Sequence, residues 1–188
     1  MLVVLLLLVS AAPWAHGSSE NARLPVSGPA PEFSLLDQNG APFTLTGLRG
    51  KVVVVTFMYT RCNQACPVLT EKMASLQAML GPEFASRVHF VSISIDPEVD
   101  TPAVLRDYAK THGANVAGWS FLTGTRPMVE EVERAYGALG KQPTRRGRVE
   151  RLFVTSLIDR QGSLRVRYLG NGFKREELLQ DLRVLLGE

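Results

Sequence analysis

A continuous run of β-branched and apolar residues, Lys51-Val52-Val53-Val54-Val55-Thr56-Phe57-Met58, constrains the fold of this chain more than any other feature. A strand that faces water on one side alternates apolar and polar residues, so an unbroken apolar run predicts a central strand buried on both faces. Cys62 and Cys66, the only two cysteines, follow this run closely. The sequence therefore places both thiols just after a buried strand, at an edge of the protein.

The residues after the second cysteine predict a helix. Pro67 disfavours helical geometry at Cys66 but suits the first position of a helix, so we expect a helix over 67–80 with Cys66 as its N-cap. Free backbone N–H groups and the helix dipole stabilise thiolates at such a position. The alternative is a structural disulfide, but a bridge across three intervening residues removes little chain entropy. Redox or soft-metal chemistry is the favoured interpretation.

Strands and helices alternate along the rest of the chain. Asn39-Gly40 lies between two apolar segments and favours a tight hairpin turn near the N-terminus. The other expected elements are strands at 88–95 and 119–122, helices at 102–112, 126–136 and 174–186, and a closing hairpin of 152–158 and 164–169. This order predicts an α/β fold with a central mixed sheet flanked by helices and an N-terminal β-hairpin.

The N-terminal segment indicates export. The first nineteen residues carry no Lys, Arg, Asp or Glu, and the apolar run from Leu2 to Ala12 is shorter than the roughly 20 residues of a membrane span. We therefore assign 1–17 to a signal peptide, with an uncleaved anchor as the alternative, 18–31 to a linker and 32–188 to one domain. An exported chain is periplasmic or otherwise extracytoplasmic, where disulfides persist.

The charge of the chain excludes one class of partner. A net charge of +3 is too small to indicate nucleic-acid binding. The positive charge is concentrated between Lys141 and Arg151, a stretch that also contains Arg145, Arg146 and Arg148. We interpret this basic stretch as a solvated loop, with a docking surface for an acidic partner as the alternative.

Four sequence blocks resemble the Sco/SenC family, the copper-handling assembly factors of cytochrome c oxidase. The blocks are Thr56-Phe57-Met58-Tyr59-Thr60-Arg61-Cys62-x-x-x-Cys66-Pro67, Val91-Ser92-Ile93-Ser94-Ile95-Asp96-Pro97-Glu98-x-Asp100-Thr101-Pro102, Trp119-x-Phe121-Leu122-Thr123-Gly124 and Leu157-Ile158-Asp159-x-x-Gly162. The resemblance spans most of residues 30–188. It implies a thioredoxin-like fold and a copper site at Cys62 and Cys66.

The family's third copper ligand is a histidine, and this chain departs from the pattern there. Counting back from the Leu157-Ile158-Asp159 block, the histidine position falls on Arg151. A guanidinium group has no acceptor and no accessible neutral form, so it cannot coordinate a metal. We interpret Arg151 either as one more charge of the basic stretch or as a cation beside the cysteines that lowers their pKa values.

Other side chains are weaker ligand candidates. We expect His89 and His112 to have structural roles and His16 to leave with the signal peptide. Met58, Met73 and Met79 have a spacing typical of core residues. The acidic residues Asp96, Glu98 and Asp100 resemble a hard-metal site, but the neighbouring prolines and Thr101 favour strand termination and helix capping.

The resemblance implies a function for the thiol pair. We expect Cys62 and Cys66 to bind copper, with Cu(I) preferred because it is soft and Cu(II) disfavoured without the histidine. The expected partner is the copper-site subunit of a terminal oxidase, and the expected state is a monomer. The alternative function is a thiol-disulfide oxidoreductase acting on an oxidase subunit or another exported client, with Cys62 as the attacking thiol. A peroxidase of the peroxiredoxin type is a third alternative.

Overall fold

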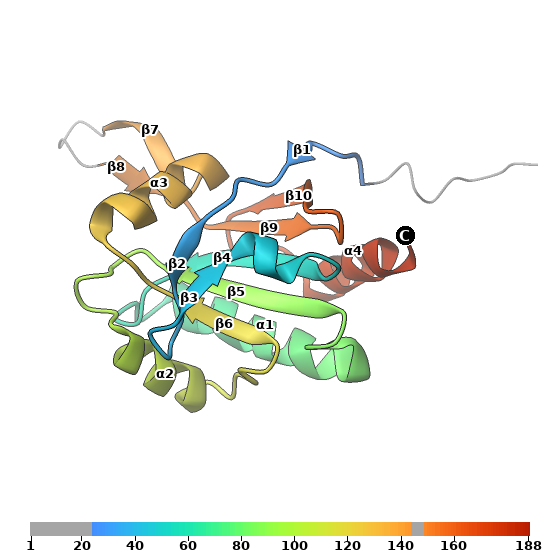
Figure 1. Ribbon diagram of the computed structural model, residues 1–188, viewed down its shortest axis with the longest axis horizontal. Coiled ribbons are helices and arrows are strands. Elements are labelled where there is room, and N and C mark those ends of the chain that lie inside the picture. Colours follow the sequence, from blue (N-terminus) through green and yellow to red (C-terminus); the bar gives the residue numbers. More distant parts are fainter. Residues whose placement is uncertain (1–23, 144–148) are drawn as a thin grey trace, which may run out of the picture.

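A six-stranded mixed sheet forms the centre of the molecule in the computed structural model, which describes residues 24–143 and 149–188 (Figure 1). Its strand order is β1-β10-β9-β4-β5-β6. These strands are β1 (Gly28–Pro29), β4 (Val52–Met58), β5 (Val88–Ser94), β6 (Trp119–Leu122), β9 (Val154–Ile158) and β10 (Ser163–Leu169). Strands β4, β5 and β6 run parallel, whereas β9 is antiparallel to β4 and to β10. The α/β class and the mixed sheet predicted from the sequence are confirmed.

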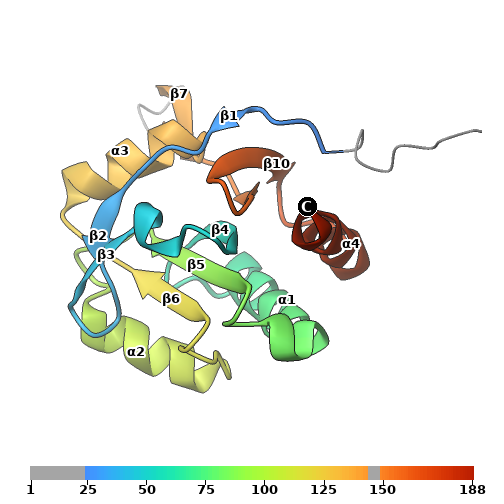
Figure 2. The same ribbon diagram turned by 45° about the vertical axis from the view of Figure 1, so that its right-hand side comes forward.

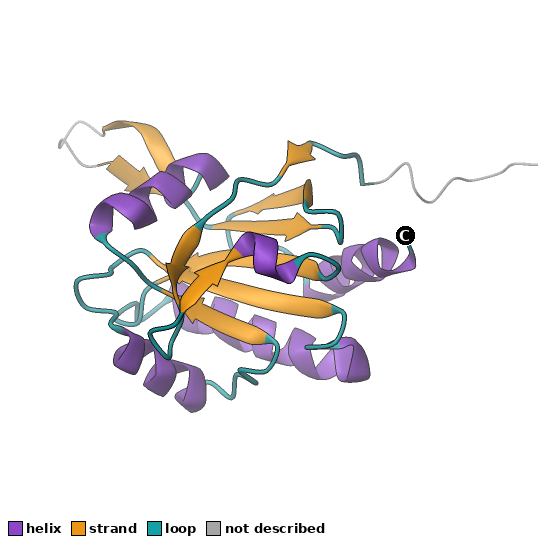
Figure 3. Cartoon of the chain, viewed as in Figure 1, coloured by secondary structure: helices purple, strands orange, loops and turns teal. Residues whose placement is uncertain are grey.

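Helices and a hairpin cover both faces of this sheet (Figure 3). The helices are α1 (Ala65–Leu80), α2 (Pro102–Thr111), α3 (Arg126–Tyr136) and α4 (Arg175–Gly187), with short 3-10 helices at Leu45–Leu48 and Gly81–Glu83. The hairpin pairs β2 (Ser34–Leu36) with β3 (Pro42–Thr44). Its turn contains Gly40, whose φ of +77° is a conformation that glycine adopts without strain. The predicted N-terminal hairpin is thus confirmed.

Strand β4 contributes side chains to two separate cores. Val52 and Val54 pack with α1, α2 and α4 on one face, whereas Val53, Val55 and Phe57 pack with α3 and the hairpin on the other. Figure 2 shows α1 and α2 on the opposite side of the sheet from α3. Because successive side chains point to opposite faces of a strand, each of these residues is buried. This is the physical reason for the unbroken apolar run.

Two expectations about helix α1 are wrong. Helix α1 begins at Ala65, so Cys66 lies inside its first turn rather than at the N-cap, which is Gln64. The N–H groups of a first turn have no partner within the helix, so Pro67 is accommodated at the third position. Met79 is 42% exposed and is not a core residue, whereas Met58 and Met73 are buried as expected.

Part of the basic stretch forms a two-stranded ribbon. Strand β7 (Leu139–Pro143) pairs antiparallel with β8 (Val149–Arg151), where the sequence predicted a loop. Residues 144–148, with Arg145, Arg146 and Arg148, lie outside the described residues. The predicted signal peptide of 1–17 lies outside them as well. Part of the segment assigned to the linker belongs to the sheet, because Gly28–Pro29 pair with β10.

A buried arginine joins the two ends of the described chain. Arg165 on β10 donates hydrogen bonds to the carbonyl oxygen of Leu24 and to the carboxylates of Asp159 and Glu188. Only 7% of its side chain is exposed. Within the described residues, no helix has both the length and the apolarity needed to cross a membrane.

Candidate functional site

Both cysteines lie where β4 ends and α1 begins. The backbone N–H of Cys62 donates to the carbonyl oxygen of Tyr59 at 3.2 Å, which turns the chain between the two elements. The carboxyl ends of the parallel strands β4, β5 and β6 meet at the same edge of the sheet. This edge therefore gathers the cysteine loop and the loop that follows β5.

The two thiols differ in exposure and in hydrogen bonding. Cys66 is fully buried, whereas Cys62 is partly exposed, and both are free thiols. The backbone N–H of Cys66 donates to the sulfur of Cys62 at 3.2 Å. The structure thus brings the two predicted site residues together and leaves Cys62 as the accessible sulfur.

The surroundings of the thiols move their pKa values apart. Burial opposes ionisation of Cys62, but hydrogen bonds from the Cys66 thiol, from the N–H groups of Gln64 and Cys66, and from the Tyr59 hydroxyl lower its pKa. Burial, followed by the interaction with Cys62, raises the pKa of Cys66 to about 12. Cys62 is therefore the thiol that ionises first.

A buried carboxylate anchors the cysteine loop. Asp100 is completely buried and accepts hydrogen bonds from the backbone N–H and the hydroxyl of Thr60 and from the hydroxyl of Ser94. These bonds join the loop after β4 to the loop after β5. Thr101 caps α2 as predicted, since its hydroxyl accepts from the N–H of Val104.

The other two acidic residues of that loop form ion pairs. Asp96 pairs with Arg61 at 2.8 Å and with Arg126 at 3.5 Å. Arg126 also pairs with Glu98 and donates to the carbonyl oxygen of Ile95. The carboxylates of this cluster thus have cationic or hydrogen-bonding partners from the chain itself.

Arg151 forms an ion pair with a buried glutamate. Its Nε donates to Oε1 of Glu133 on α3 at 2.9 Å, and the Glu133 side chain is completely buried. Burial raises the pKa of Glu133, although the charge of Arg151 acts in the opposite direction. The sequence interpretation that Arg151 lowers the pKa values of the cysteines stays a prediction, since the main contributions described above come from other groups.

Neither described histidine joins the cysteines. The Nε2 atom of His89, on β5, lies 2.9 Å from the hydroxyl of Ser120, and burial lowers its pKa to about 4. His112 follows α2 and lies against the ring of Tyr108. Across 24–143 and 149–188, no third His, Cys, Asp or Glu side chain lies with the two thiols in a group that could hold a metal ion.

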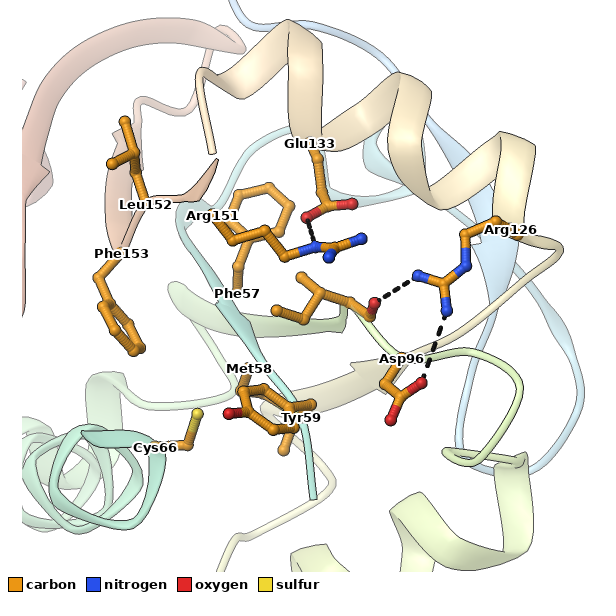
Figure 4. Close-up of a pocket in the computed structure, with 11 residues that line it drawn as sticks. Phe57, Met58, Tyr59, Cys66, Asp96, Arg126, Glu133, Arg151, Leu152 and Phe153 are labelled. Atoms are coloured by element: carbon orange, nitrogen blue, oxygen red, sulfur yellow. Dashed lines mark hydrogen bonds and ion pairs between the residues drawn. The ribbon is translucent and has the colours of Figure 1, made fainter. Parts of the chain in front are cut away.

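A pocket of about 420 Å³ opens beside Cys66 (Figure 4). It is lined by Phe57, Met58, Tyr59, Cys66, Ile95, Asp96, Arg126, Glu133, Arg151, Leu152 and Phe153. Apolar side chains thus share the wall with two arginines and one of the thiols. Arg151 and Cys66 therefore line the same pocket.

Sequence reasoning missed three residues of this site. Tyr59 lies within the first motif block but was given no role, and Asp100 was interpreted as serving strand termination and helix capping. Glu133 lies on the buried face of α3 with Val129, Val132 and Tyr136. A charged residue within an apolar helical stripe is a signal for a buried ion pair, and this signal was available in the sequence.

The site can perform two kinds of chemistry. Two adjacent thiolates are suitable ligands for Cu(I), which prefers sulfur, and the sulfurs present fit that ion without a histidine. An accessible thiol beside a buried second thiol can also exchange with a disulfide.

Three solved structures resemble this chain over most of its length. A SCO1/SenC family lipoprotein of Bacillus anthracis is 30% identical, with a TM-score of 0.74 over 86% of this chain and 97% of that one. BsSco, a member of the Sco family of cytochrome c oxidase assembly proteins with an identified disulfide switch, is 27% identical, with a TM-score of 0.70 over 86% and 95%. Bradyrhizobium japonicum ScoI with copper bound is 29% identical, with a TM-score of 0.67 over 82% and 97%.

Sequence comparisons agree with these structures. The first two curated relatives are 34% and 32% identical, and the matched regions cover 58% and 54% of their lengths. This chain therefore matches little more than half of each. The family model described as SCO1/SenC matches residues 24–187. The thioredoxin-like α/β fold and the family match agree, and the chain belongs to the SCO1/SenC family.

Proposed function

We propose that this chain binds copper through Cys62 and Cys66 and assists assembly of the copper site of cytochrome c oxidase. The proposal is supported by family membership and by the copper-bound structure of a 29% identical relative. The observation that carries it is the pairing of a partly exposed Cys62 with Cys66 at the first turn of α1. Two thiolates favour Cu(I) over harder ions.

A competition titration tests copper binding. Reduced protein should retain one equivalent of Cu(I) against a chromophoric Cu(I) chelator of moderate affinity. The Cys62→Ser and Cys66→Ser variants should each release the copper to the chelator. Met79→Leu is the matched control, because it removes an exposed sulfur on α1 and should leave binding unchanged. Wild-type protein that surrenders all of its copper would rule out the proposal.

The identity of the copper partner is tested separately. We infer that the recipient is the copper-site subunit of a terminal oxidase. Copper-loaded protein mixed with the apo form of that subunit's soluble domain should transfer its metal, as read from the absorption of the recipient's copper centre. Copper that stays on this chain while an equal amount of free Cu(I) loads the recipient would contradict delivery.

Arg151 sets the expected oxidation state. We propose that it stands where other family members supply a histidine ligand, so this chain prefers Cu(I). Arg151→His would add a nitrogen ligand, and the variant should then show a thiolate-to-Cu(II) absorption band that wild type lacks. An equally strong band in wild type would reveal a ligand other than the two thiols.

The second candidate function is thiol-disulfide exchange, which the different surroundings of the two thiols favour. Cys62 would attack a client disulfide, and Cys66 would then resolve the mixed disulfide and release the reduced client. Cys66→Ser should accumulate the mixed disulfide with an exported client, whereas Cys62→Ser should not. Failure of Cys66→Ser to trap any client would exclude this function.

The site of action is inferred from the N-terminal sequence. We infer that the chain is exported, in line with the lipoprotein nature of the Bacillus anthracis relative, and that it acts as a monomer. Cell fractionation of the expressed full chain should recover it outside the cytoplasm. Sedimentation of the purified protein should give a mass near 20.6 kDa, or less after signal removal.

A further inference from the structure

The pocket beside Cys66 contains a guanidinium group held in one orientation. Arg151 donates from Nε to the buried Glu133, and this bond fixes the plane of the group. Within the described residues, no hydrogen bond or ion pair uses the two terminal nitrogens of Arg151. These nitrogens form the end-on fork of the guanidinium group, which binds a carboxylate through two parallel hydrogen bonds.

The other arginine of the pocket is already engaged. Arg126 donates to both oxygens of Glu98 and to the carbonyl oxygen of Ile95. Figure 4 shows it turned toward Asp96, whereas Arg151 extends alongside Glu133. Arg151 is therefore the donor that remains for a ligand in the pocket.

Glu133 orients Arg151 and offers a ligand no contact of its own. Its Oε2 is buried and has no hydrogen-bond partner among the described residues, so a group of the size of water does not reach it from the pocket. The fork of Arg151 is therefore the polar feature that selects the ligand, and the group that it fits is a carboxylate.

The remaining lining determines what else the ligand carries. Phe57, Met58 and Phe153 supply apolar wall, and Cys66 brings a sulfur to the same pocket. The volume of about 420 Å³ accommodates a small molecule but not a folded domain. A small molecule with a carboxylate at one end and a sulfur at the other matches this arrangement.

We propose that the pocket binds the carboxylate end of small disulfides that carry a carboxylate group, and that these disulfides exchange with Cys62 and Cys66. This inference rests on the proposed redox role of the two thiols. The thiolate of Cys62 attacks one sulfur of the small disulfide, forming a mixed disulfide and expelling one small thiolate. Cys66, after losing its proton to solvent, attacks the Cys62 sulfur and expels the second small thiolate. The protein loses two electrons to the small disulfide, which becomes two thiols.

The test compares two small disulfides. 3,3′-Dithiodipropionate carries carboxylates, and bis(2-hydroxyethyl) disulfide carries none. The ratio of their rate constants with reduced full-length protein should be about tenfold higher in wild type than in Arg151→Gln, which corresponds to about 1.4 kcal/mol of carboxylate binding. The ratio is measured within one sample, so a variant that is partly unfolded still reports the preference of its folded fraction.

Two further variants make the test specific. Arg61→Gln removes an equal charge next to Cys62 but outside the pocket lining, and it should keep the preference. Glu133→Gln together with Arg151→Gln avoids stranding a buried charge, and it should lose the preference. Equal ratios in wild type and Arg151→Gln, or an equal loss in Arg61→Gln, would overturn the inference. If neither disulfide oxidises the protein, both this inference and the proposed redox role fail, whereas copper retention would still test the copper proposal.

Discussion

The backbone N–H of Cys66 donates to the sulfur of Cys62 at 3.2 Å, so the buried cysteine stabilises the thiolate of the exposed one. Cys62 should therefore react first with an alkylating reagent such as iodoacetamide near neutral pH. In single variants, the thiol left in Cys66→Ser should react about a hundredfold faster than the thiol left in Cys62→Ser, because a thiolate reacts and a buried thiol is inaccessible. Mass spectrometry of timed samples measures both rates.

Denaturant provides the control for this difference in reactivity. In unfolding concentrations of urea, the two variants should react at similar rates, since both thiols are then exposed. Similar rates in the native proteins would show that the fold does not distinguish the thiols.

Asp100 should be required for the position of the cysteine loop. Asp100→Asn replaces one acceptor oxygen with an amide NH2 group, which cannot accept from Thr60 or Ser94. We expect the free energy of unfolding to fall by about 1–3 kcal/mol, the usual cost of an unsatisfied buried group. Urea unfolding measures the loss, and Cu(I) affinity should fall in the same variant.

Asp107→Asn is the matched control, because Asp107 is exposed on α2. It should change neither stability nor copper affinity. A normal copper affinity in a destabilised Asp100→Asn protein would mean that Asp100 supports the fold but not the site.

His89 should make stability depend on pH. Burial, with a smaller contribution from Lys51, lowers its pKa in the folded protein to about 4 from 6.5. The unfolded chain therefore binds a proton that the folded protein excludes, and stability falls as the pH drops from 6.5 toward 4. The expected slope is about 1.4 kcal/mol per pH unit within this window. Urea unfolding of the reduced protein at several pH values measures it.

His89→Gln should remove this dependence while keeping a hydrogen-bonding group near Ser120. His112→Gln serves as the control and should leave it in place. Parallel pH profiles for wild type and His89→Gln would contradict the assignment.

Arg165 should contribute strongly to stability. Arg165→Ala leaves the buried carboxylate of Asp159 without its cation and frees the carbonyl oxygen of Leu24. Removing one partner of a buried ion pair costs about 3–5 kcal/mol. By contrast, Arg134→Ala removes the exposed pair with Glu130 on α3 and should cost less than about 0.5 kcal/mol. Equal losses in the two variants, measured by thermal or urea unfolding, would refute the distinction.

Local sequence patterns predicted the central elements well. The apolar run of β4, the Asn39-Gly40 turn and the proline at the start of α2 each express a preference that depends on neighbouring residues alone. The predicted start of α1 was wrong because that prediction also relied on neighbouring residues alone. The local effect of Pro67 indicated a boundary at Cys66, whereas the helix begins at Ala65.

The ribbon of β7 and β8 could not be predicted in this way. Its sequence has no alternation of apolar and polar residues, and the ribbon comes directly after α3 in the chain. The ion pair between Arg151 and Glu133 joins β8 to α3, and no local sequence pattern indicates that these two residues meet.

The sequence by itself determined the α/β class and the family and singled out the two cysteines, because strand burial and motif spacing are local properties of the chain. Only the tertiary structure decided that Cys62 is the partly exposed thiol with the lowered pKa, that Asp100 holds its loop and that Arg151 lines a pocket with Cys66. These are relations between segments far apart in sequence. They exist only once the strands have brought their carboxyl ends to one edge of the sheet.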